Sequence, residues 1–272
     1  MKRNVLILFS FLLILPLSKS FATGQIPDRL IYKGDTLSIF ANPLEQLYDN
    51  DSLRPEFFGK TEACMSTACW RGYQAEWEII ENHLYLTGIY SCCYSEDSIK
   101  ADLKKLFGVA LIDGKVKADW FTADIIAPQG KELYYVHMGY GSLYEKELEL
   151  QFKNGQLLGT KTYNNTKSKQ SIYSQNSEKL NEFIYSNINW INLPKLDGQV
   201  IKVYVQFSAN ENGLIDSVEI MRGYDAIFDK EACRVVKTIP EWDIYYRHEK
   251  HERMTWGLPI VFSEENKIKY QK

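Results

Sequence analysis

The sequence lacks several features that would point to a particular class of function. Its formal net charge is −3, so it has no basic excess of the kind that nucleic-acid-binding proteins use to displace counterions from phosphate. It contains no Gly-x-Ser-x-Gly nucleophile motif, no glycine-rich phosphate loop and no His-Glu-x-x-His metal motif. Spacing alone does not pair the scattered acids Asp35, Asp97, Asp124 and Glu145 as acid and base. We therefore predict no catalytic residues, no cofactor, no metal site and no nucleic-acid partner.

Long hydrophobic runs are also missing after residue 22, where nothing approaches the roughly 20 apolar residues of a transmembrane helix. The chain begins with Lys2 and Arg3, continues with an apolar run that ends at Pro16, and then reaches small residues at Ser20 and Ala22. This layout is typical of a cleavable signal peptide over residues 1–22, the alternative being an uncleaved membrane anchor. We expect a periplasmic or secreted protein with no stable membrane anchor after cleavage.

Cysteines are few, and four of the five lie in the first half of the chain: Cys64, Cys69, Cys92 and Cys93. In an oxidising compartment these four can form two disulfides. Because a bond between the vicinal Cys92 and Cys93 would be strained, we expect bridges from Cys64 and Cys69 to that pair. A four-thiolate zinc site is the alternative, but neither pair has the usual Cys-x-x-Cys spacing. Cys233 falls in a helical pattern and is expected to be a small, half-buried apolar residue.

Residues 23–163 are predicted to form a disulfide-bearing, mostly antiparallel β domain with one helix, over residues 98–107. Many tyrosines and tryptophans accompany the strands. They could line a ligand groove, although such residues more often pack in the core and across strands. Turn signals between apolar segments indicate hairpins at residues 33–35, 81–83 and 154–155.

A polar stretch, residues 164–177, has the composition of a linker and separates this domain from residues 178–272. The second region follows the order helix, hairpin, helix, strand. Apolar residues between Phe228 and Ile239 recur at the spacing of an amphipathic helix. Pro259 lies inside the last predicted strand, and proline cannot donate a ladder hydrogen bond, so that strand should lie at a sheet edge.

Five short sequences in the second region carry a family resemblance: VYVQF at residues 203–207, NGLID at 212–216, DKEACRVV at 229–236, IPEW at 239–242 and LPIVF at 258–262. Together they resemble the C-terminal domain of TonB, the periplasmic energy transducer of bacterial outer-membrane transport. The resemblance covers residues 178–262. It implies an α+β domain whose exposed sheet edge accepts an extended peptide from a TonB-dependent outer-membrane transporter.

The last strand is the candidate partner-binding edge, with Trp256, Leu258 and Ile260 as its predicted partner-binding residues. An edge strand offers unpaired backbone groups that an incoming strand can satisfy. The alternative is that these side chains complete the domain core. The membrane segment looks cleavable and no proline-rich spacer follows it, so we expect a binding module without active force transmission.

The sequence thus predicts an exported α+β interaction protein: a mostly antiparallel β domain followed by a small TonB-like helix–hairpin–helix–strand domain. The alternative function is a periplasmic ligand- or surface-binding protein that acts through the aromatic β domain. An enzyme of unrecognised type is a third class. His248 and His251 lie in a run saturated with charge, which favours a solvated loop over a pair of metal ligands.

Overall fold

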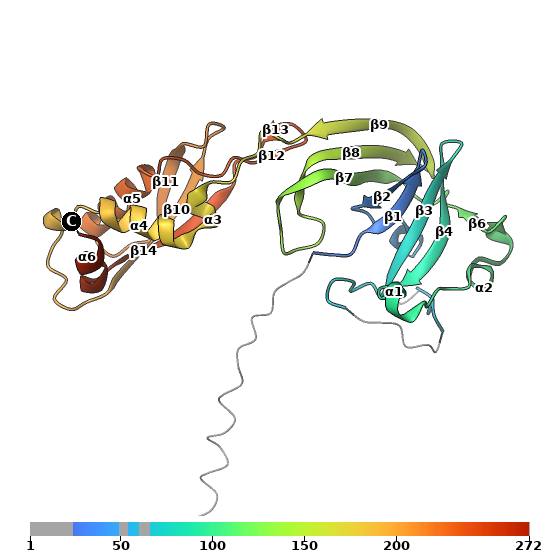
Figure 1. Cartoon of the computed structure of the whole chain (residues 1–272), viewed down its shortest axis with the longest axis horizontal. Coiled ribbons are helices and arrows are strands. Elements are labelled where there is room, and N and C mark those ends of the chain that lie inside the picture. The colour runs from blue at the N-terminus through green and yellow to red at the C-terminus, as the bar shows by residue number, and fades with distance from the viewer. Residues whose placement is uncertain (1–23, 49–53, 60–65, 272) are drawn as a thin grey trace, which may run out of the picture.

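The computed structural model describes residues 24–48, 54–59 and 66–271, which form two β-rich regions (Figure 1). The first is built on a nine-stranded sheet, in which the main path runs β2-β1-β3-β4-β9-β8-β7 and the β5–β6 hairpin lies beside β4. The second is built on a three-stranded sheet of order β11-β10-β14. The mixture of strands and helices with mostly antiparallel pairing is as predicted. The predicted signal peptide, residues 1–22, lies outside the described residues.

The first region curls so that its two outer strands, β2 and β7, approach each other. At this seam the N–H of Phe40, just after β2, donates to the carbonyl of Ile126 in β7 at 2.7 Å. Among the described strands, β1 and β3 are the one pair that is parallel. The curled sheet encloses a core around Trp77 and Tyr73. Its elements are β1 (Asp28–Tyr32), β2 (Asp35–Ile39), η1 (Pro43–Leu47), β3 (Tyr73–Ile80), β4 (His83–Ser91), α1 (Tyr94–Asp97), α2 (Leu103–Phe107), η3 (Gly108–Ala110), β5 (Leu111–Ile112), β6 (Lys115–Lys117), β7 (Ala123–Tyr134), β8 (Leu143–Lys153) and β9 (Gln156–Asn164).

The single helix predicted over residues 98–107 is wrong in its extent, because two short helices, α1 and α2, flank an extended stretch. Ser98, with φ of 54°, ends α1. The next residues pair with β4: the Ile99 carbonyl accepts from Ser91, and the Ala101 N–H donates to the Ile89 carbonyl. The Asp102 carboxylate then caps α2. Hydrogen bonding to the free side of β4 therefore decides the conformation of residues 99–101, although the apolar spacing there favours a helix.

The second region has the predicted order of helix, hairpin, helix and strand, and adds a hairpin before the last strand and a helix after it. Helix α5 packs Phe228, Ala232 and Val235 against the sheet. None of the described helices is both long and apolar enough to cross a membrane. The elements are α3 (Ile172–Gln175), α4 (Ser177–Asn187), η4 (Trp190–Asn192), β10 (Ile201–Ala209), β11 (Ile215–Arg222), α5 (Ala226–Lys237), β12 (Tyr246–Arg247), β13 (Lys250–His251), β14 (Thr255–Phe262) and α6 (Glu264–Tyr270).

The polar stretch 164–177 is a folded connection between the two regions. Asn165 is 0% exposed and Ser171 is 1% exposed. These polar residues are buried together with hydrogen-bond partners: the Asn165 amide donates to the Glu147 carboxylate at 2.9 Å, and the Ser171 N–H donates to Asp243 Oδ1 at 2.6 Å. A segment with the composition of a linker can therefore have a defined structure when its buried polar groups are hydrogen-bonded.

The charged run that contains His248 and His251 forms the β12–β13 hairpin, which lies against the first region (Figure 1). The run is therefore a hairpin and not the predicted loop, although its residues Glu249, Lys250, Glu252 and Arg253 are exposed. The ring of His248 stacks on Tyr163 with centroids 4.3 Å apart, and its Nε2 lies 3.4 Å from the buried Glu147 carboxylate. Tyr245, just before the hairpin, packs against Tyr134 of β7. The second region thus contributes a hairpin that docks on the first.

Candidate functional site

The first candidate site is the free side of β14. In the three-stranded sheet β10 is central, and within the described part of the chain β14 pairs with β10 and with no other strand. The edge position that Pro259 predicted is therefore confirmed. Pro259 faces Tyr204 in the register with β10. An edge strand exposes every second N–H and C=O along its length, so the next question is which of these groups are covered.

The end of β14 near α6 is covered by side chains of the second region itself. The N–H of Val261 donates to the hydroxyl of Tyr185 in α4 at 3.4 Å, and its carbonyl accepts from the Asn266 amide in α6 at 2.9 Å. These contacts show that the backbone of Val261 points away from β10. They also close this end of the edge to an incoming strand.

The alternation of backbone groups then fixes the outward residues in the rest of β14. Counting back by twos from Val261, the residues whose N–H and C=O face outward are Pro259, Gly257 and Thr255. Pro259 has no N–H, which is why it fits without the loss of a ladder hydrogen bond. Gly257 and Thr255 are exposed. The open part of the edge, residues 255–259, therefore offers two N–H donors and three carbonyl acceptors.

The side chains of the predicted partner-binding residues point to the core face of the sheet. Ile260 is 1% exposed and belongs entirely to the core, so its side chain is closed to a partner. Trp256 and Leu258 are half-buried and pack against the same core, with Trp256 edge-on to Trp242. The alternative that these residues complete the core therefore applies to Ile260. Trp256 and Leu258 remain partly accessible beside the open edge.

The second candidate site is a cavity of about 320 Å³ in the first region, at the seam between β2 and strands β7 and β8. Four aromatic residues line it: Phe40, Tyr135, Tyr140 and Tyr144. Phe40 and Tyr140 stack with centroids 5.1 Å apart, and Tyr144 meets Phe40 edge-on at 5.8 Å. Glu132 supplies a carboxylate to the lining. We call this the aromatic pocket; its residues are Gly24, Gln25, Pro27, Ser38, Phe40, Pro128, Glu132, Tyr135, Gly139, Tyr140, Ser142 and Tyr144.

An irregularity in β7 places Glu132 in the aromatic pocket. The register between β7 and β8 shifts on both sides of Glu132, and Gly130 has φ of +78°, a conformation that favours glycine. The Tyr144 hydroxyl donates to the Glu132 carboxylate at 3.1 Å. Burial and this carboxylate raise the pKa of Tyr144, so the phenol stays protonated and keeps donating. The bulge thus presents a carboxyl group among aromatic rings.

A buried ion pair supports the wall of the pocket behind Tyr140. The guanidinium of Arg71 lies 2.8 Å from the Asp28 carboxylate, both side chains are 0% exposed, and a second nitrogen of Arg71 donates to the Tyr140 hydroxyl at 3.0 Å. Trp77 donates its indole N–H to Asp28 at 3.1 Å. Burial alone would lower the pKa of Arg71, but Asp28, Tyr140 and Tyr73 outweigh it and raise the pKa. Arg71 therefore stays a cation beside Asp28, whose own pKa is raised by burial although Arg71 lowers it.

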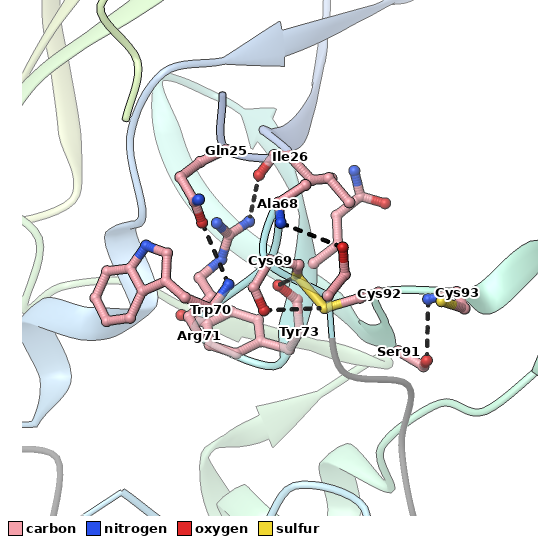
Figure 2. Close-up of a disulfide and its surroundings, with 12 residues drawn as sticks. Gln25, Ile26, Ala68, Cys69, Trp70, Arg71, Tyr73, Ser91, Cys92 and Cys93 are labelled. Atoms are coloured by element: carbon pink, nitrogen blue, oxygen red, sulfur yellow. Dashed lines mark hydrogen bonds between the residues drawn. A yellow bond between two sulfur atoms is a disulfide. The ribbon is translucent and has the colours of Figure 1, made fainter. Parts of the chain in front are cut away.

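A disulfide between Cys69 and Cys92 joins a turn to the end of β4 (Figure 2). The predicted bridge from Cys69 to the vicinal pair is thus confirmed. Cys93 is disulfide-bonded as well, whereas Cys64 lies outside the described residues. Cys233 is a free cysteine, half-buried in α5. A disulfide of this kind is consistent with an oxidising, extracytoplasmic compartment.

The turn that carries Cys69 also holds the N-terminal wall of the aromatic pocket. Ile26 donates its N–H to the Ala68 carbonyl at 2.6 Å. Trp70 donates its N–H to the Gln25 side chain at 3.3 Å (Figure 2). Arg71 lies in the same turn. The disulfide therefore fixes the turn, and the turn fixes both the segment before β1 and the ion pair behind Tyr140.

Sequence reasoning missed Glu132, Phe40 and Tyr144 as neighbours in one cavity. These residues come from strands far apart in the chain, and the seam that joins them is a tertiary contact. One local signal was available, since Gly130 interrupts a strand pattern two residues before Glu132 and such a glycine indicates a bulge. Across the described residues, no group of three or more His, Cys, Asp or Glu side chains is placed to hold a metal ion.

Comparisons with known proteins add no assignment to this geometry. No protein-family model, curated protein or solved structure matches the chain. The resemblance of residues 178–262 to the C-terminal domain of TonB therefore stays a prediction that rests on the short sequences quoted above.

Proposed function

We propose that this chain is an exported interaction protein whose TonB-like second region pairs the open edge of β14 with an extended segment of a partner. The partner that the resemblance implies is a TonB-dependent outer-membrane transporter, which places the protein in the periplasm and in outer-membrane transport. The observation that carries the proposal is the short run of outward backbone groups at residues 255–259, beside the covered end at Val261.

The geometry of this edge defines what a partner strand would meet. An added strand would exchange hydrogen bonds with Thr255, Gly257 and the carbonyl of Pro259. Its side chains on the core face would lie beside the half-buried Trp256 and Leu258, which gives apolar contacts and a basis for selectivity. The covered end limits the pairing to a few residues, so we expect a short contact of moderate affinity.

The proposal is tested by removing one outward backbone N–H of β14 while the strand itself is kept. Gly257→Pro removes an outward N–H, as Pro259 already does naturally, and leaves the ladder with β10 unchanged. Gly257→Ala is the matched control, because it keeps the N–H and an added Cβ meets no atom within 4 Å. Binding of synthetic peptides from the plug segments of outer-membrane transporters is measured by calorimetry on the mature chain.

We expect Gly257→Pro to weaken peptide binding about tenfold, the cost of about one hydrogen bond at a strand interface, and Gly257→Ala to bind as the wild type does. Thermal unfolding of both variants serves as the check on folding. Equal binding by Gly257→Pro and Gly257→Ala, or no binding of any peptide at millimolar concentration, would contradict the proposal.

A second candidate function is favoured by one observation, the aromatic pocket at the β2–β7 seam. Its volume and lining suit a small-molecule ligand, in keeping with a periplasmic ligand-binding protein that acts through the aromatic β domain. The pocket and the β14 edge lie in different regions, so a single chain can carry both functions.

A further inference from the structure

The aromatic pocket contains a carboxylate that has no cationic partner within the described residues. Within the described residues, Glu132 accepts a hydrogen bond from the Tyr144 hydroxyl and takes part in no ion pair. The other pocket residues are aromatic, small or uncharged. A half-buried anion surrounded by aromatic rings attracts a cation in two ways, through its own charge and through the negative faces of the rings.

The cations behind the pocket wall do not serve this purpose, because each of them is already bound by other groups. Arg71 is paired with Asp28. Arg247 donates to the Gly141 carbonyl in the β7–β8 loop and to the Tyr245 hydroxyl. Burial lowers the pKa of Arg247, but Tyr245 and, after it, Glu147 and Glu252 raise the pKa overall. Both guanidinium groups are therefore engaged outside the pocket, and Glu132 is left to a ligand.

The shape of the pocket restricts the kind of cation. A cavity of about 320 Å³ exceeds the volume of a metal ion by far, and the described residues supply no further carboxylate beside Glu132 in the lining. A metal ion would prefer several oxygen ligands over aromatic rings. An alkylammonium group offers a charge for Glu132 and polarised methyl groups for the rings of Phe40, Tyr135, Tyr140 and Tyr144.

We infer that the aromatic pocket binds a small organic cation of the methylated-ammonium class, with Glu132 as the counter-charge and Phe40, Tyr140 and Tyr144 as the aromatic wall. The inference rests on the second candidate function and is independent of the β14 edge. Tyr135 closes the outer side of the pocket, where its hydroxyl accepts a hydrogen bond from the Gly24 N–H at 3.1 Å. The disulfide-bearing turn that holds Gln25 and Ile26 keeps this closing segment in place.

The experiment titrates the mature chain with choline chloride and, in parallel, with dimethylbutanol, the uncharged carbon isostere of choline. Calorimetry gives the affinity, and tyrosine and tryptophan fluorescence gives a second readout. We expect saturable binding of choline and binding of the isostere weaker by about tenfold or more, since the isostere keeps the shape and loses the charge. Equal affinity for the two probes, or no binding of choline, would overturn the inference.

Three variants tie the binding to the pocket. Glu132→Gln keeps the shape and the hydrogen bond to Tyr144 while removing the charge, and should weaken choline binding about tenfold. Phe40→Leu keeps an apolar group and removes a ring, and should weaken choline more than the isostere. Glu219→Gln, on the exposed face of β11, makes the same change of charge elsewhere and should bind as the wild type does. An unchanged choline affinity in Glu132→Gln would overturn the inference.

A panel of neutral sugars separates the inference from the function on which it rests. Saturable sugar binding that Phe40→Leu weakens, without choline binding, would keep the ligand-binding function and overturn the choice of an organic cation. Choline binding that depends on Glu132 would support both.

Discussion

The two sheets of this protein differ at their edges: the outer strands of the first approach each other, whereas the second keeps an open edge strand. In the first region the outer strands β2 and β7 approach each other and share the hydrogen bond from Phe40 to Ile126, so the sheet curls around a core and leaves a cavity at the seam. In the second region the sheet stays open, and β14 keeps outward backbone groups at residues 255–259. A closed seam suits the enclosure of a ligand, whereas an open edge suits the recruitment of a strand.

The regions also differ in what holds them together. The first depends on the disulfide of Cys69 and on the ion pair of Arg71 with Asp28, in addition to its apolar core. The second depends on the packing of α5 and α4 against its sheet, and its single cysteine, Cys233, is free. Removal of the disulfide or of the ion pair should therefore lower the stability of the first region and leave that of the second nearly unchanged. This difference can be measured.

The largest expected effect comes from Arg71→Met. The change leaves the Asp28 carboxylate buried without its cation, which costs about 3–5 kcal/mol of unfolding free energy. Urea unfolding followed by two-dimensional NMR reports each region separately. We expect the signals of the first region to disappear at lower urea and those of the second to change little.

The double variant Asp28→Asn with Arg71→Met is the control for this effect. It removes the buried charge and keeps an oxygen that can accept from Trp77, so it should regain a large part of the loss. A single Arg71→Met variant within about 1 kcal/mol of the wild type would show that the ion pair does not hold the first region.

Removal of the disulfide should have the next largest effect. With Cys69→Ser and Cys92→Ser together, the unfolded chain gains freedom and the first region loses about 2–4 kcal/mol. Cys233→Ser, in the second region, is the matched control and should stay within about 1 kcal/mol of the wild type. The same NMR-detected urea titration measures both, and equal losses in the two regions would argue against a local role of the disulfide.

A smaller effect is expected at the junction, where Asn165→Ala removes the amide that donates to Glu147 at 2.9 Å. The loss of this buried hydrogen bond should cost about 1–3 kcal/mol. Because the Glu249 N–H in the hairpin turn also contacts Asn165, amide exchange in β12 and β13 should speed up. Unchanged exchange in these two strands would mean that Asn165 does not hold the hairpin on the first region.

The smallest expected effect is a pH dependence of the second region. The hydrogen bonds and charge of Arg253 lower the pKa of the exposed Asp216 carboxyl below its usual value near 3.8. A lowered folded-state pKa gives stability that is present above the usual value and lost as the pH falls through the lowered one. We therefore expect the second region of Asp216→Asn to lose less stability than the wild type as the pH falls below about 4, and NMR-detected acid titrations measure this loss. An identical acid titration of the variant would contradict this.

The elements that sequence reasoning placed well are those whose signals are local. The alternation along β10 and the spacing of Phe228, Ala232 and Val235 in α5 identify a strand and a helix without any knowledge of the tertiary fold. Pro259 likewise indicates an edge by its own chemistry. The helix over residues 98–107 was misplaced because β4 offered its backbone groups to that stretch, a fact that lies outside the stretch itself.

The parts that could not be predicted depend on contacts between distant residues. Asp28 and Arg71 each look like ordinary surface charges in the sequence, and only the fold buries them as a pair. The polar residues 164–177 acquire partners from β8 and from the β12–β13 hairpin, which no composition reveals. Glu132 enters the aromatic pocket through a bulge and a seam between strands that are far apart in the chain.

The central claim, that β14 keeps an edge for a partner strand, is tested most directly by amide hydrogen exchange of the mature chain with and without a bound transporter peptide. The N–H of Gly257 points outward and should exchange fast in the free chain, whereas the inward N–H of Ile260 should exchange slowly in both states. The account predicts that peptide binding slows the exchange of Thr255 and Gly257 and leaves Ile260 unchanged. A bound peptide that leaves the Gly257 exchange rate as it was, or a Gly257 amide already protected in the free chain, would contradict it.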